Sequence, residues 1–91
     1  MTEIIALDYA RTPGLFPEAF AAWLIEHLSA WLYFERAVFA MQSQGNKVSA
    51  RNIICLMRTR GFRIVNNYSP LLARLWVCVH GIHVFTKNGG R

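Results

Sequence analysis

Apolar side chains recur at helical spacing from residue 17 to residue 44. Pro17 is typical of a first helical position, and Gly45 is typical of a residue that ends a helix. The positions that follow the i, i+3, i+4, i+7 rhythm are Phe20, Trp23, Leu24, His27, Leu28, Trp31, Phe34, Val38 and Met41. A second apolar line lies on another face, so we expect the segment to be enclosed on several sides. It is either one central helix or two helices that break near 27–29 and pack on each other.

The rest of the chain contains two shorter helical patterns. Ser49 is a favourable cap for the free backbone N–H groups of a helix, and we expect a helix over 49–60. Ser69 followed by Pro70 predicts the start of another helix, with Ser69 as its cap, and Gly81 predicts its end.

Two short runs rich in β-formers, 62–65 and 82–85, are expected to be strands that pair with each other. Residues 1–16 are expected to form an N-terminal arm, as a short strand or a loose segment. The chain is therefore expected to be one mainly α domain over 1–91 with a short two-stranded element. Its parts are the arm, the long or broken helix 17–44, and a helix-strand-helix region over 46–91.

The charges are segregated along the chain. Residues 1–35 hold all five acidic residues and one base, a formal charge of −4, whereas residues 36–91 hold nine bases and no acid, a formal charge of +9. Bases without carboxylates nearby project a positive potential that attracts polyanions or an acidic protein face. This region is therefore where we expect a partner to bind.

The basic region has the layout of a small helix-turn-helix or winged-helix domain. A helix ends near Gln44, a turn follows, and the helix 49–60 places residues 51, 55 and 58 on one face. Arg and Asn are the side chains that read guanine and adenine edges, and a basic strand after such a helix suits a wing on backbone phosphates. The expected nucleic-acid or partner-binding residues are Lys47, Arg51, Asn52, Arg58, Arg60, Arg63 and Arg74. The simpler interpretation is an amphipathic helix with a solvated basic face.

Composition indicates a globular chain with more apolar surface than a small monomer readily hides. Of 91 residues, 54% are hydrophobic and 13% aromatic. Either a homodimer forms through helix 17–44 or the aromatic residues make a tight core. Two cysteines make no disulfide scaffold, and we see no signal peptide and no apolar run long enough for a bilayer. We expect a protein of a reducing cytoplasm, with no membrane partner.

No catalytic motif or cofactor signature emerges. Cys78, His80 and His83 all have ligand side chains, but their spacing matches no established metal site and a fourth ligand would have to come from afar. Glu26 and Glu35 are nine positions apart and lie on different helix faces, which does not suit two-carboxylate chemistry. We expect no enzyme, no metal and no cofactor.

Several segments resemble a group of short bacteriophage and prophage proteins. The residues that carry the resemblance are Ser49–Ile54, Met57-Arg58, Phe62–Pro70 and Ala73–Leu75, together with the aromatic-rich helix from Trp31 to Gly45. The resemblance covers roughly residues 20–76, and the chain departs from the group at its end, where only Val84-Phe85 and Arg91 remain of the usual paired aromatics and Arg.

The resemblance implies phage origin, hence the cytoplasm of a bacterial host, without a defined activity. We expect a small DNA-binding protein that regulates transcription or replication through its basic helix and wing. The alternative is a phage inhibitor of anti-defence or anti-CRISPR type, a host-takeover protein. It would use the same basic and aromatic surface against an acidic or nucleic-acid-binding host protein.

Overall fold

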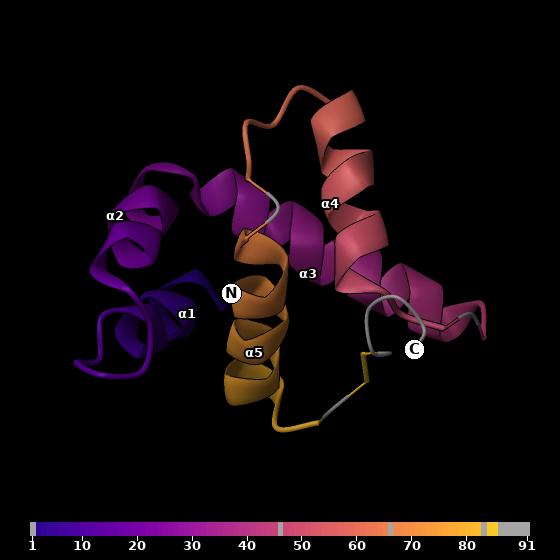
Figure 1. Ribbon diagram of the computed structural model, residues 1–91. Coiled ribbons are helices and arrows are strands. Elements are labelled where there is room, and N and C mark those ends of the chain that lie inside the picture. Colours follow the sequence, from indigo (N-terminus) through magenta and orange to yellow (C-terminus); the bar gives the residue numbers. More distant parts are fainter. Residues whose placement is uncertain (1, 46, 66, 83, 86–91) are drawn as a thin grey trace.

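Five helices make up the part of the chain that the structure describes. The computed structural model describes residues 2–45, 47–65, 67–82 and 84–85. The helices are α1 (Glu3–Ala10), α2 (Glu18–Glu26), α3 (Leu28–Ser43), α4 (Ala50–Thr59) and α5 (Tyr68–His80). Figure 1 shows α3 running across the molecule, with α1 and α2 near its N-terminal end and α4 near its C-terminal end. The helix α5 packs against both α1 and α4, so all the helices share one hydrophobic core.

The apolar segment 17–44 is broken, as one of the two sequence interpretations predicted. His27 has φ −135° and ψ 45°, outside the helical region, and it separates α2 from α3. Pro17 has extended backbone and lies immediately before α2. The break lets both helices bury their apolar faces in the same core, because the chain changes direction between them.

The N-terminal segment corrects our expectation of an arm or strand. Glu3–Ala10 is helical, and α1 packs against α5 and α2. Its inner face consists of Ala6 and Ala10, which are 0% and 2% exposed, while Ile4 on the outer face is 74% exposed. Small side chains allow close approach of the helix backbone to its neighbours. The usual apolar periodicity is absent because Ile4 and Ile5 face outward while small alanines face the core.

The expected pair of strands was also wrong. Within the described residues, 62–65 has no strand partner, and Phe85 forms a single parallel bridge with Val48 instead. The carbonyl groups of Arg63 and Ile64 accept hydrogen bonds from side chains rather than from a neighbouring strand. Residues 82–85 include His83, which lies outside the described residues. The described part of the chain is therefore all-helical apart from that bridge, and it shows no wing.

The start of α5 differs from the prediction, whereas its end agrees. The helix begins at Tyr68, so Ser69 lies inside the first turn and is buried at 3% exposure. Asn67 takes the cap position without a side-chain hydrogen bond. Gly81 ends the helix with φ +75°, a left-handed conformation that glycine adopts without steric cost.

The aromatic and aliphatic residues of the long segment lie mostly inside the molecule. Across all the helices, the largest fully buried side chains are Trp31, Trp76, Phe20, Phe34, Leu24, Ile53, Ile54, Met57, Leu72, Leu75 and Val38. On segment 17–44, Ile25 and Phe39 are each 47% exposed. The radius of gyration, 12.3 Å, matches the ~12 Å expected for a compact chain of this length. The apolar excess that suggested a homodimer is thus largely taken up by the chain's own core.

Candidate nucleic-acid interface

The helix α4 forms as its sequence predicts. The Ser49 hydroxyl accepts a hydrogen bond from the backbone N–H of Asn52 at 3.3 Å, which satisfies one free donor of the first turn. The inner face is buried and consists of Ala50, Ile53, Ile54 and Met57. The remaining positions are therefore directed to solvent: Arg51, Asn52, Cys55, Leu56, Arg58 and Thr59 are all exposed.

The connection between α3 and α4 resembles a helix-turn-helix only in outline. The two helices are in contact, and Gly45 supplies a positive φ of 75° at the end of α3. Six residues, 44–49, separate the helices, whereas the usual motif uses a turn of about three or four. The part of the prediction that agrees with the structure is the helix α4 with a basic outer face.

Five of the predicted basic residues lie on α4 or in the segments beside its ends. Lys47 precedes the helix, Arg51 and Arg58 lie on it, and Arg60 and Arg63 follow it. All five are exposed. We call these five residues, together with Asn52, the α4 surface.

Arg58 has a positioning role within this surface. Its Nε donates a hydrogen bond to the carbonyl oxygen of Ile64 at 2.9 Å. Ile64 is itself buried, at 7% exposure. The contact fixes segment 62–65 beside the C-terminal end of α4, so the backbone that carries Arg63 is held in place.

The positive charges of the α4 surface have no counterion among the described residues. In the part of the chain that the structure describes, the one contact within salt-bridge distance joins His80 and Glu35. No described carboxylate therefore pairs with an arginine or lysine of the α4 surface. Their charge acts on whatever approaches from solvent.

Arg74 lies apart from the other predicted site residues. Its guanidinium carbon lies 4.7 Å from the centre of the Phe16 ring, and Nη2 donates to the carbonyl oxygen of Leu15. Both partners belong to the segment between α1 and α2. Arg74 is thus engaged by the chain itself, and we do not include it in the α4 surface.

Sequence reasoning missed a polar network that links α1, α3 and α5. His80 Nε2 lies 2.6 Å from Glu35 Oε2, and it must donate because an ionised carboxylate only accepts. The Thr2 hydroxyl lies 2.8 Å from each Glu35 oxygen and accepts a hydrogen bond from Trp31 Nε1 at 3.0 Å. The side chains of His80 and Glu35 are only 20% and 13% exposed. No sequence signal indicated the network, since its members are 29 to 45 positions apart wherever they touch.

Replacing Glu35 with glutamine should lower the free energy of unfolding by about 1.5–3 kcal/mol, because hydrogen bonds to a charged group are lost. Glutamine keeps the size of the side chain but removes the charge that holds His80 and Thr2. Urea unfolding measures the effect. Glu26→Gln, on the exposed end of α2, is the matched control and should change stability by less than ~0.5 kcal/mol. Equal stability of the two variants would show that the charge of Glu35 contributes nothing to the stability of the fold.

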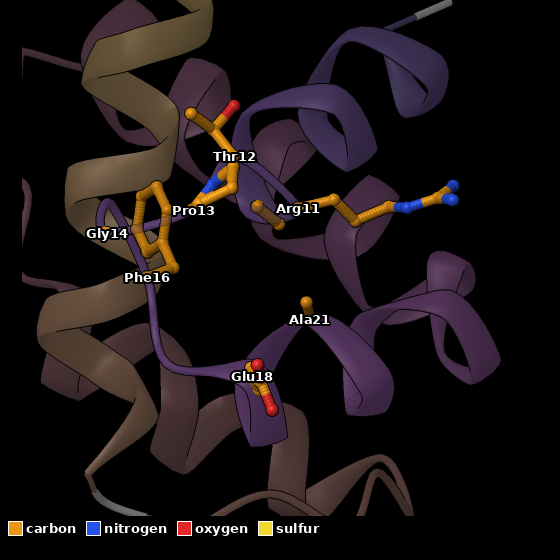
Figure 2. Close-up of a pocket in the computed structure, with 8 residues that line it drawn as sticks. Arg11, Thr12, Pro13, Gly14, Phe16, Glu18 and Ala21 are labelled. Carbon is orange, nitrogen blue, oxygen red and sulfur yellow. The ribbon is translucent and has the colours of Figure 1, made fainter.

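A shallow hollow of about 320 Å³ lies where the α1–α2 connection meets α2. It is lined by Ala10, Arg11, Thr12, Pro13, Gly14, Phe16, Glu18 and Ala21. Figure 2 shows that Arg11 extends away from the hollow. The lining offers Glu18 as a carboxylate and Thr12 as a hydroxyl, without an imidazole or thiol beside them. None of the lining residues belongs to the α4 surface.

The described residues contain neither a cluster of metal-ligating side chains nor a membrane-spanning helix. Among the described residues, no three His, Cys, Asp or Glu side chains are grouped as metal ligands would be. Of the three candidate metal ligands from the sequence, Cys78 and His80 lie on α5, and His83 lies outside the described residues. Cys55 and Cys78 are both free thiols. In the same part of the chain, no helix has both the length and the apolar character that a bilayer span requires.

Comparison with protein-family models, with curated proteins and with solved structures found no match.

Proposed function

We propose that this protein binds DNA through the α4 surface. The observation that carries the proposal is the group of exposed cations on and beside one helix with no described carboxylate to neutralise them. Electrostatic attraction between such cations and backbone phosphates supplies most of the affinity of non-specific DNA binding. The resemblance to short phage proteins makes a regulator of transcription or replication the biological role we propose.

The α4 residues divide into two roles. Arg51 and Asn52 lie on the outer side of the first turn of α4, where side chains of a groove-binding helix reach base edges. Lys47, Arg60 and Arg63 lie beyond the helix ends, where contacts to backbone phosphates fix the position of a protein on DNA. The described fold has no wing. The irregular segment 60–65 therefore makes the phosphate contacts that we expected of a wing.

One observation favours the alternative function. Leu56 on α4 and Val65 beside it are 46% and 54% exposed, so apolar side chains accompany the cations. Apolar anchors surrounded by charge are typical of protein interfaces. They suit a phage inhibitor of anti-defence type that binds an acidic face of a host protein.

Fluorescence anisotropy with a short labelled duplex at low salt tests the proposal. We expect binding with a Kd of about 10⁻⁴ to 10⁻⁶ M or tighter, the range of non-specific DNA binding. An excess of unlabelled duplex should reverse the signal. No change in anisotropy up to ~10⁻⁴ M protein would overturn DNA binding in favour of the protein partner.

A further inference from the structure

Four aromatic rings form a continuous stack along α2. The ring centres of Phe16 and Phe20 are 5.5 Å apart, those of Phe20 and Trp23 are 6.1 Å apart, and those of Trp23 and His27 are 4.9 Å apart. Their planes are inclined by 30°, 23° and 13° in the same order. Tyr68, from the start of α5, contacts both Phe20 and Trp23. We call Phe16, Phe20, Trp23 and His27 the aromatic stack.

The two ends of the aromatic stack differ. At one end, the Arg74 guanidinium covers the Phe16 ring at 4.7 Å. At the other end, His27 is partly exposed, and its ring contacts no aromatic ring other than Trp23 among the residues described. His27 is therefore the end of the stack that no described aromatic ring or guanidinium covers.

The hydrogen bonding of His27 leaves one ring nitrogen for a ligand. Nδ1 lies 2.7 Å from the carbonyl oxygen of Trp23, and it must donate because a carbonyl only accepts. The same bond fixes the ring in its stacked orientation. Nε2 makes no hydrogen bond to any other described residue, so it is available at the edge of an incoming ring.

The aromatic stack and the α4 surface meet at the segment between α4 and α5. Trp23 Nε1 donates to the carbonyl oxygen of Arg63 at 3.4 Å, while Arg58 Nε donates to that of the next residue, Ile64. In Figure 1 this segment runs from the end of α4 back toward the junction of α2 and α3. Phosphates bound at Arg63 would therefore place adjoining bases near the exposed end of the stack.

We propose that His27 receives an unpaired nucleobase of the DNA bound at the α4 surface. The inference rests on the proposed function and adds its substrate class, which is DNA with a single-stranded segment next to a duplex. Stacking on aromatic side chains is the usual way in which proteins hold unpaired bases. Glu26, exposed and directly before His27, repels a phosphate but not a neutral base, which favours a base at this position.

Anisotropy measurements on two labelled DNAs test the inference: a blunt duplex, and the same duplex with a short unpaired extension. The extended DNA should bind about 5-fold to 150-fold more tightly, the range for one stacked base. In His27→Asn, the asparagine side chain keeps an N–H group that can donate to the Trp23 carbonyl but has no ring. This variant should therefore bind the extended DNA only as tightly as the duplex. His27→Phe restores a ring and should restore the preference.

Tyr9→Asn is the control, because Tyr9 is an exposed ring on α1, 37% exposed, outside the aromatic stack. This variant should keep the full preference for the extended DNA. Equal binding of both DNAs by the unmodified protein, or a preference that survives in His27→Asn, would overturn the inference while duplex binding still stands. If neither DNA binds at low salt, the proposed function itself fails.

Discussion

Replacing Trp31 with alanine should lower the free energy of unfolding by about 3–5 kcal/mol. Trp31 is 0% exposed, and its ring packs against Phe34 with centres 6.4 Å apart. The substitution removes this buried ring and leaves a cavity that rigid helices fill only in part. A small domain has only about 5–15 kcal/mol of stability, so the variant should be near its unfolding threshold at 25 °C.

Trp31→Phe separates packing from hydrogen bonding. Phenylalanine keeps an aromatic ring but loses the Nε1 donor to the Thr2 hydroxyl, so we expect a smaller loss, about 1–2 kcal/mol. Urea titrations followed by circular dichroism measure the free energy of unfolding of both variants. Its slope against urea concentration should stay unchanged if unfolding stays two-state. A loss below ~1 kcal/mol for Trp31→Ala would contradict the position of this side chain at the centre of the core.

The double variant Arg60→Ala/Arg63→Ala, which removes two of the proposed phosphate contacts, should bind duplex DNA about 60-fold more weakly at ~0.1 M salt. Each phosphate contact contributes a factor of about 8 at that salt concentration, because affinity changes with a log–log slope of ~0.9 per contact. Both side chains are exposed, and the Arg63 contact to Trp23 uses the backbone carbonyl, so the fold should be kept. Arg58 is left intact because it holds segment 62–65 through Ile64.

The matched control is Arg11→Ala/Arg36→Ala, which removes the same charge from exposed positions on other elements. If net charge alone attracts DNA, the two double variants should lose affinity equally. If the α4 surface is the binding site, the control should lose less than about 5-fold. Equal losses would therefore contradict a localised interface.

The sequence predicts those parts of the fold whose signals are local. The helix α4 combines a capping Ser49 with four apolar residues at helical spacing, and both features act within ten residues. The end of α5 at Gly81 was predictable for the same reason. In α1, by contrast, Ile4 faces solvent and alanines face inward, so the usual pattern gives no signal.

The pairing of β-rich runs failed because tertiary contacts override local preference. Segment 62–65 has strand-forming residues, but its carbonyl groups bind Trp23 and Arg58 side chains from two different helices. The break at His27 was foreseen as one of two outcomes, since length alone argued for it. Only the contacts of α2 and α3 with the rest of the core decide between one continuous helix and two separate helices.

For the candidate site, the sequence located the bases but not their surroundings. Exposure of Lys47, Arg51, Arg60 and Arg63 follows from the amphipathic pattern and from turn residues. The engagement of Arg74 with Phe16 joins residues 58 positions apart, and the link from Trp23 to Arg63 spans 40 positions. Contacts at such separations depend on helix packing, which no local pattern encodes.

A salt titration of duplex binding by the unmodified protein tests the central claim most directly. If the cations of the α4 surface meet phosphates, the logarithm of the association constant should fall linearly with the logarithm of salt concentration. Three phosphate contacts, from Lys47, Arg60 and Arg63, predict a slope of about −3, and Arg60→Ala/Arg63→Ala should reduce its magnitude by about 2. A slope near zero, or one that the double variant leaves unchanged, would contradict the account.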